Sequence, residues 1–431
     1  KRTVTGINTL TQGINGNNSQ NPDTCVHMPD VWNYNDGSET QCTVNFGNNP
    51  TFGGYVGISS FYTDGNGRGR FKYEVPSGFL SLHRENLPEP AILKPGDHFK
   101  PVIYEGDGLD CHEIRVGFQP DLIITLWRNA DDNRVVWDSV RGSNRFWYLN
   151  ATNAETISTN GIKAVGPAGY TVGNWNNMND GSDDDYVAYC WKAGNKTIPN
   201  SEGSINTLIS VNKTAGFSIC GYTGTNSNGT LGHGLGKVPK FAIFKGRGDT
   251  GNGAVYHWRI GSTHVLRIST NDAKDDENTA FADTDPTDKL FTLGTWAGTQ
   301  INGCPMISYI WAEIEGFSKF DSYTGNGSLN GPFVYCGFKP AWIMYKQTGS
   351  GENWECFDSA RDTRNPRLYG FKMNTNDAET DDIVDSTRRY GIDFLSNGFC
   401  IRSTATRVNA SGKEYIFAAF AEAPYKYANA D

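Results

Sequence analysis

A phrase that ends in proline recurs three times in this chain of 431 residues, and the constant spacing around it limits the folds open to the sequence. An aromatic residue follows each proline after 17 positions. The prolines are Pro120, Pro239 and Pro340, and the aromatic residues are Trp137, Tyr256 and Phe357. A Tyr-x-Gly turn precedes each proline by 16 or 17 positions, so two spacings are kept in every copy. The sequence therefore predicts three copies of one structural unit.

The residues after each aromatic position extend the repeat. The run Trp137-Asp138-Ser139-Val140-Arg141 matches Phe357-Asp358-Ser359-Ala360-Arg361, whereas the middle copy reads Tyr256-His257-Trp258-Arg259. The aromatic residue and the arginine are kept, and the middle copy lacks the aspartate. Each unit spans roughly 100 residues, a common size for a domain with its own core. We predict an N-terminal arm with a small β region at residues 1–97, and repeats at residues 98–195, 205–315 and 316–424.

A short apolar run follows each proline and ends in polar turn residues, which is the pattern of a buried strand. Because proline lacks an amide hydrogen and has a fixed φ, it belongs at the entrance of such a strand and not inside it. Sustained helical periodicity is absent, and turn residues recur about every 8–12 positions. These patterns predict an all-β protein of tandem antiparallel β-sandwiches with jelly-roll or concanavalin-like connections.

The links between copies predict how the units are joined. The stretch 192–203 is polar and contains glycine and proline, so it predicts a connector between the first two repeats. Residues 313–317 leave almost no slack between the second and third repeats, which predicts a stiff rod at that point.

Composition argues against several functions. The net charge of −9 leaves no basic field for nucleic acid, and the chain has no apolar run of 18 residues that would insert into a membrane. The nine cysteines are widely spaced without a CxxC pair, so we expect free structural thiols. If one bridge exists, Cys25 and Cys42 are its best candidates. This usage suits a protein made in a reducing cytoplasm.

Two aspartates and two glutamates recur in the first and third copies and are the obvious candidates for paired catalytic carboxylates. They are Asp138, Glu155, Asp358 and Glu379. A glycosidase needs two carboxylates about 5–10 Å apart across a cleft. The alternative is an Asp-Ser turn whose carboxylate pairs with Arg141 or Arg361, and the loss of the aspartate in the middle copy favours this structural interpretation.

Metal and cofactor chemistry has little support in the sequence. The seven histidines lack the HExxH and HxH spacings, and no phosphate loop or serine elbow is present. The acidic stretches 180–185 and 272–277 are expected to be solvated turns, with calcium binding as the alternative. We therefore predict no enzyme activity, no metal and no cofactor.

Aromatic side chains on β loops are a usual means of holding a sugar ring. Those in loop-like or turn-flanking places are Trp32, Tyr34, Trp147, Tyr148, Trp175 and Trp354. The alternative is that they fill the cores of small sandwiches or the contacts between them.

Several motifs resemble a repeated domain of unknown function found in appendage proteins of marine tailed phages. They include Tyr323-Thr324-Gly325-Asn326-Gly327-Ser328, Phe357-Asp358-Ser359-Ala360-Arg361-Asp362 and Phe417-Ala418-Ala419-Phe420-Ala421-Glu422-Ala423-Pro424. The earlier copies match through Val187-Ala188-Tyr189-Cys190-Trp191-Lys192-Ala193-Gly194, and the resemblance extends over about residues 44–424. It implies a virion structural or fibre protein, displayed on the extracellular particle and made in the host cytoplasm.

Three functional hypotheses follow. The first is a tail-fibre-like appendage subunit that docks on other virion proteins and recognises a host-surface glycan or protein receptor by binding. Such rods usually gain stability and avidity as homotrimers, so we expect that assembly. The second hypothesis is a purely structural capsid or tail decoration protein. The third, and least favoured, is a polysaccharide depolymerase.

Overall fold

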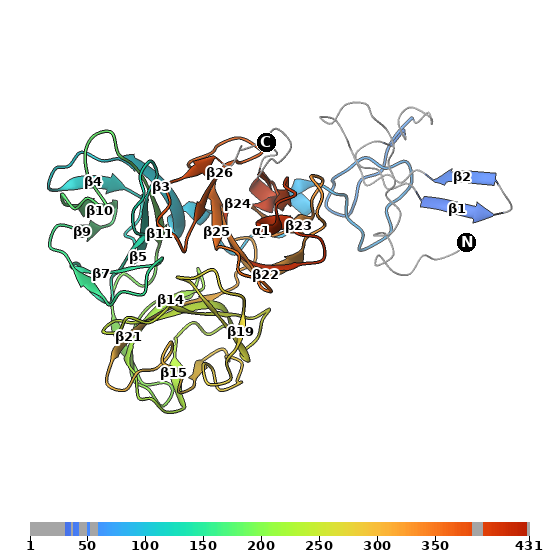
Figure 1. Ribbon diagram of the computed structural model, residues 1–431. Helices are drawn as coiled ribbons and strands as arrows, with labels where there is room; N and C mark the ends of the chain where they lie inside the picture. Colours follow the sequence, from blue (N-terminus) through green and yellow to red (C-terminus); the bar gives the residue numbers. More distant parts are fainter. Residues whose placement is uncertain (1–30, 36–37, 43–49, 52–58, 382–390, 429–431) are drawn as a thin grey trace. The chain divides into compact units, whose positions relative to one another are not determined.

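The computed structural model describes residues 31–35, 38–42, 50–51, 59–381 and 391–428. The chain divides into two compact units, Lys1–Glu89 and Pro90–Asp431. The larger unit is built almost entirely of antiparallel β-sheets (Figure 1), which confirms the all-β fold class. Ile92 lies in its core, so this unit includes residues just before the first repeat.

The N-terminal unit contains a hairpin of β1 (Val31–Asn35) and β2 (Ser38–Cys42). One loop of this unit is organised by the Asp64 carboxylate, which accepts hydrogen bonds from Ser81 N at 2.8 Å, Ser81 Oγ at 2.7 Å and Asn86 Nδ2 at 2.7 Å. Burial would raise the pKa of Asp64, but hydrogen bonds led by that from the Ser81 backbone hold it well below its ordinary value. The predicted arm at residues 1–20 lies outside the described residues.

Each repeat contributes one large sheet, and the three sheets share a strand order. In the first repeat the order is β3 (Phe99–Glu105), β11 (Asp185–Trp191), β5 (Leu122–Trp127), β6 (Val135–Asp138), β7 (Arg145–Tyr148), β8 (Thr156–Ile157). In the second it is β14 (Phe217–Thr223), β21 (Pro305–Ala312), β16 (Pro239–Gly246), β17 (Ala254–His257), β18 (His264–Arg267), β19 (Asp275–Asp276). In the third it is β22 (Ser318–Thr324), β30 (Glu414–Pro424), β24 (Phe338–Gln347), β25 (Glu355–Asp358), β26 (Tyr369–Lys372), β27 (Thr380–Asp381). The second sheet is wider, because β12 (Ile198–Asn200) and β13 (Thr207–Asn212) extend it beyond β14.

A smaller sheet accompanies each large one. These sheets are β4 (His112–Arg115), β10 (Gly169–Val172) and β9 (Ile162–Gly166) in the first repeat, β15 (Gly229–Gly232) and β20 (Leu290–Leu293) in the second, and β23 (Phe333–Tyr335), β29 (Gly398–Ile401) and β28 (Ile392–Leu395) in the third. The one α-helix among the described residues is the short α1 (Thr406–Asn409). Single-turn 3₁₀ helices lie at η2 (Arg84–Asn86), η3 (Pro95–Asp97) and η4 (Tyr425–Tyr427).

The central strands bury both faces, which explains their continuous apolar sequence. Alternate residues of a strand point to opposite faces. In β5, Ile123 packs into a core that belongs to the first repeat, whereas Leu122 and Ile124 face a core that all three repeats share. In β16, Ala242 and Phe244 pack inside the second repeat, while Phe241 and Ile243 face the shared core.

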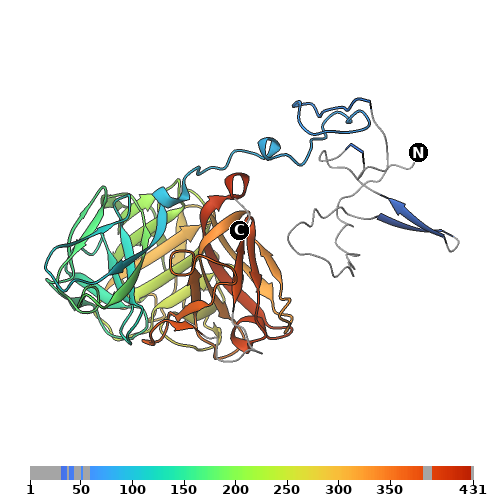
Figure 2. The ribbon, with the colours of Figure 1, turned by 90° about the horizontal axis from the view of Figure 1, so that it is seen from above.

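The three repeats therefore pack face to face instead of forming a row (Figures 1 and 2). Trp191 and Trp311, which occupy matching positions on the central strands of repeats one and two, meet with ring centroids 6.0 Å apart. Phe420 of the third repeat lies 5.6 Å from Trp191. Aromatic contacts of this kind bury large apolar areas, so the shared core is a major source of stability.

The same backbone hydrogen bond recurs at each contact between two repeats. We call each contact a seam and number it by the two repeats that it joins. At seam 1–2, Glu155 N donates to Arg247 O at 2.7 Å; at seam 2–3, Lys274 N donates to Thr348 O at 2.9 Å; at seam 3–1, Glu379 N donates to Arg128 O at 2.7 Å. The acceptors Arg128, Arg247 and Thr348 each lie eight residues after the repeated proline. The repeats therefore contact one another in a closed ring of three, and the same backbone hydrogen bond is present at each contact.

Buried cations reinforce these seams. Lys245 Nζ donates to Thr152 O at 3.0 Å across seam 1–2, and Lys346 Nζ donates to Asn271 O at 3.2 Å across seam 2–3. Burial lowers the pKa of both lysines to about 8. Leu126 stands at the matching position of the first repeat, and at seam 3–1 the Arg134 guanidinium instead donates to backbone carbonyls of the third repeat.

The repeated aspartate of one repeat also binds a tyrosine of the next repeat around the ring. Tyr309 Oη donates to Asp138 Oδ2 at 2.7 Å across seam 1–2, and Tyr189 Oη donates to Asp358 Oδ2 at 2.9 Å across seam 3–1. At seam 2–3 both partners differ. Ala418 pairs with the residue four positions after the repeated proline, where the other repeats have tyrosine, and His257 replaces aspartate. His257 Nε2 donates to Phe417 O at 3.2 Å instead.

The structure corrects three sequence-based expectations, on the rod, the connector and the third proline. The rod between repeats two and three is wrong, because the third repeat folds back to contact both others. The connector at residues 192–203 is wrong in part, since it contains β12, which pairs with β13. Pro120 and Pro239 stand at strand entrances as expected, but Pro340 is the third residue of β24, where the ladder shifts register and leaves room for a residue without an amide hydrogen.

We predict that Tyr309→Phe lowers the free energy of unfolding by about 2 kcal/mol, because it removes a hydrogen bond to a buried charged group. Tyr189→Phe should have a similar effect at seam 3–1. Denaturant unfolding measures both, with Tyr335→Phe as control, because the Tyr335 side chain is 60% exposed. The seam interpretation is wrong if the two seam variants unfold like this control.

Candidate functional site

The aspartates that sequence analysis offered as catalytic acids are sealed inside the repeats. Asp138 and Arg141, and likewise Asp358 and Arg361, form ion pairs whose side chains are 0% exposed. Asp138 Oδ1 also accepts from Val140 N at 3.0 Å and Arg141 N at 2.9 Å, as in an Asp-Ser turn. The turn and salt-link interpretation of these residues is therefore confirmed, and each carboxylate is bonded to its own turn, to its arginine and to a tyrosine across a seam.

The two glutamates serve the seams. Glu155 contacts Arg247 Nε at 2.8 Å across seam 1–2, and Glu379 contacts Arg128 Nε at 2.7 Å across seam 3–1. Their side chains are only 7% and 8% exposed. Burial would raise the pKa of Glu155, but hydrogen bonds from Arg247 and Arg145 hold it below its ordinary value. The four carboxylates thus join repeats, and none of them faces a cleft.

The middle repeat departs from the motif because its seam is built differently. His257 is buried beside Phe417 O, and the next residue, Trp258, extends across seam 2–3, where its Nε1 donates to Phe320 O at 2.6 Å. Arg259 pairs with Asp321 of the third repeat. The substitution of aspartate and serine by histidine and tryptophan is therefore a change of contact at this seam.

The six aromatic residues proposed as a binding face do not form one. Trp147 and Trp354 are each 1% exposed in the shared core, where Trp147 Nε1 donates to Tyr309 Oη at 3.0 Å. Tyr148 and Trp175 are half-buried against the inner core of the first repeat. Trp32 and Tyr34 fall in strand β1, and their side chains lie outside what the structure describes. For Trp147 and Trp354 the core-filling alternative is confirmed.

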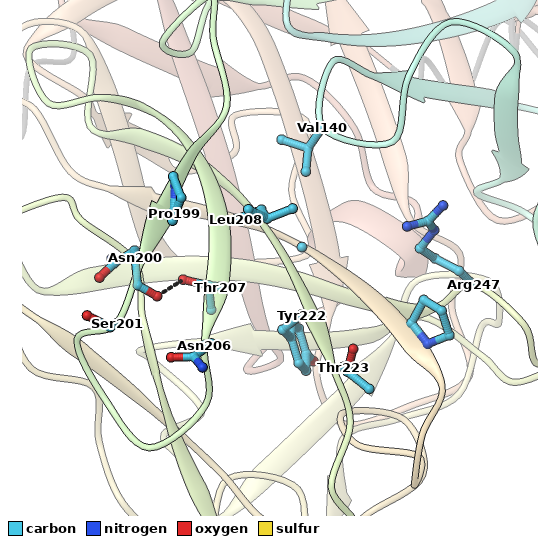
Figure 3. Close-up of a pocket in the computed structure, with 12 residues that line it drawn as sticks. Val140, Pro199, Asn200, Ser201, Asn206, Thr207, Leu208, Tyr222, Thr223 and Arg247 are labelled. Atoms are coloured by element: carbon cyan, nitrogen blue, oxygen red, sulfur yellow. Dashed lines mark hydrogen bonds between the residues drawn. The ribbon is translucent and has the colours of Figure 1, made fainter.

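A groove of about 570 Å³ opens at seam 1–2, in the volume range of sites that bind small ligands (Figure 3). Val140 of the first repeat forms one wall of the groove. Its floor is formed by β13, β14 and the start of β21 of the second repeat. Sequence analysis missed it, because Pro199, Asn200 and Ser201 come from a stretch expected to be a connector, and the motif residues Val140 and Tyr222 come from different repeats.

The groove offers uncharged hydrogen-bonding groups. The side chains of Ser201, Asn206 and Thr223 are exposed, and Thr207 Oγ1 is held by Gly232 O at 3.1 Å. The single cation at the groove, Arg247, is neutralised by Glu155. Leu208, 49% exposed, adds an apolar surface beside these polar groups (Figure 3). The site can therefore bind a neutral, hydroxyl-rich molecule.

Among the described residues, no group of three or more histidine, cysteine, aspartate or glutamate side chains is placed to hold a metal ion. No described helix is long and apolar enough to cross a membrane.

A family model for a domain of unknown function, DUF7483, matches residues 94–424. The chain belongs to the DUF7483 family. The matched range runs across all three repeats, so the unit that this DUF7483 model describes is the whole closed ring and not a single repeat. No curated protein matches the chain.

We predict that acid destabilises the protein through His257. Burial lowers its pKa from 6.5 to about 4, so the unfolded chain takes up this proton at higher pH than the folded protein. The contribution is fully present above pH 6.5 and is lost as pH falls towards 4. Relative to His257→Gln, the native protein should lose about 2–3 kcal/mol of unfolding free energy between pH 7 and 4.5. A pH-independent difference between the two proteins, measured by urea unfolding, would contradict the buried neutral histidine.

Proposed function

We propose that this protein is a structural and binding subunit of a phage appendage, and that it binds a neutral host-surface glycan in the groove at seam 1–2. The observation that carries the proposal is the lining of the groove, where exposed amide and hydroxyl groups stand beside Leu208 and Val140. Sugar hydroxyls exchange hydrogen bonds with such groups, and the apolar face of a sugar ring packs on aliphatic side chains.

Charge supports a neutral ligand over an acidic one. Arg247 is the only cation lining the groove among the described residues, and two hydrogen bonds tie it to Glu155, at 2.8 and 3.1 Å. An acidic sugar would compete with this buried carboxylate for the guanidinium and would have to break a seam contact.

The closed ring supports a binding role instead of turnover. The recurrent carboxylates hold the repeats together, and the groove walls are strands whose positions the seams fix. A preorganised wall favours affinity because little ordering remains to be done on binding. On a phage appendage, as the resemblance of the sequence suggests, such a site would be exposed on the virion surface and would meet a host envelope.

A homotrimer remains a prediction. Separate chains gain stability in such an assembly when their flat sides bury one another. Three repeats of one chain already do so in the shared core. Avidity is therefore the remaining reason for a trimer, while stability no longer requires one.

The second candidate is a purely structural decoration protein. The observation in its favour is the density of seam contacts, including the buried hydrogen bonds from Tyr309 to Asp138 and from Tyr189 to Asp358. Labelling of intact particles separates the two candidates, since a receptor-binding subunit must lie at a free end of an appendage.

We expect the protein to bind one or more neutral oligosaccharides on a panel of bacterial envelope saccharides. Asn206→Ala should weaken that binding about fivefold to tenfold, which corresponds to about one hydrogen bond. Isothermal titration calorimetry measures the change. Asn330→Ala, an exposed asparagine of the third repeat, is the matched control and should bind like the native protein. If no saccharide binds, or if Asn206→Ala has no effect, the groove is not a glycan site.

A further inference from the structure

The three seams differ at one position on the outermost strand of the shared strand order. The matching residues are Pro101 in β3, Ile219 in β14 and Phe320 in β22, as the ladders to the central strands show. At each ladder the backbone groups of this residue point away from the central strand. Lys192 N donates to His98 O at 2.9 Å, so residues 98, 100 and 102 form the bonded pairs and Pro101 falls between them. Its carbonyl faces outward.

At seam 1–2 a strand covers this position, because Ile219 pairs with Ser210 of β13. At seam 2–3 a side chain covers it, because Trp258 Nε1 donates to Phe320 O at 2.6 Å. The Trp258 ring is held between Lys240 Nζ, 3.8 Å from its centroid, and the Arg259 guanidinium, 4.1 Å away. The protein thus supplies its own example of how a tryptophan caps this carbonyl.

At seam 3–1 the matching residues are small. Ser359 stands where the middle repeat has Trp258, and its amide donates to Ala341 O at 2.8 Å just as Trp258 N donates to Lys240 O at 3.0 Å. Ala360 and Ala341 replace Arg259 and Lys240. A hollow of about 420 Å³ results, lined by Pro101, Lys100 and Phe99 on one side and by Ser359, Ala360 and Ala341 on the other.

We propose that this hollow is a docking site for a tryptophan side chain of a partner protein. The ring enters where Trp258 lies at seam 2–3, and its ring N–H donates to the outward-facing Pro101 carbonyl. Lys100, whose Nζ donates to Val116 O at 3.2 Å, stands at the rim as Lys319 does at seam 2–3. A polypeptide is the fitting source, because β3 is an edge strand and can hydrogen-bond to an extended partner segment. This site is separate from the glycan groove and does not depend on it.

The test uses the full chain and the peptide acetyl-Gly-Trp-Gly-amide, with binding measured by saturation-transfer NMR. Saturable binding is expected, and acetyl-Gly-Phe-Gly-amide, which lacks the ring N–H, should bind about fivefold or more weakly. Free indole tests whether the ring alone suffices; if it binds as tightly as the tryptophan peptide, the partner-protein assignment is overturned.

Ser359→Trp places the template ring in the hollow from within and should weaken peptide binding more than about tenfold while raising the melting temperature. Ser201→Trp, which obstructs the glycan groove at seam 1–2, is the matched control and should leave peptide binding unchanged. The proposal is overturned if the tryptophan peptide does not bind the native protein, or if Ser359→Trp, shown to be folded by its cooperative melting, binds it as before.

Discussion

The Asp138 carboxylate, shared between an arginine of its own repeat and a tyrosine of the next, is the contact on which the rest of this fold depends. A carboxylate without solvent needs charge compensation and hydrogen bonds for each oxygen. Arg141 and the turn amides supply part of this within the repeat, and Tyr309 supplies the remainder only when the neighbouring repeat is in place. The repeat is therefore incomplete by itself, and its burial requires the ring to close.

Seam 2–3 shows what happens when the residues of this contact change. Tyrosine is replaced by Ala418, and the aspartate that would have lost its partner is replaced by His257. A buried carboxylate without the tyrosine would be costly, whereas a neutral histidine needs one acceptor and finds it at Phe417 O. The two substitutions are therefore coupled, because the loss of the tyrosine removes the hydrogen-bond donor that a buried aspartate would need.

Both proposed sites lie where the pseudo-equivalence of the seams is broken. The groove at seam 1–2 exists because β12 and β13 extend the second sheet, and the hollow at seam 3–1 exists because Ser359 and Ala360 are small where Trp258 and Arg259 are large. At seam 2–3 the surface that matches the hollow is covered by Trp258. Duplication built a stable ring, and divergence at the seams gave each contact a different surface.

The amino-acid sequence alone determined that three copies of one all-β unit follow one another, because the proline, the aromatic residue and the buried strand between them are set by local backbone and burial rules. It also determined that Asp138 and Arg141 form an internal link, since both lie in one short turn. Only the tertiary structure decided that the copies close into a ring, that Tyr309 completes Asp138, and that Trp147 and Trp354 are buried. These contacts join residues more than 60 positions apart, and no local pattern specifies which face of one sheet packs against another.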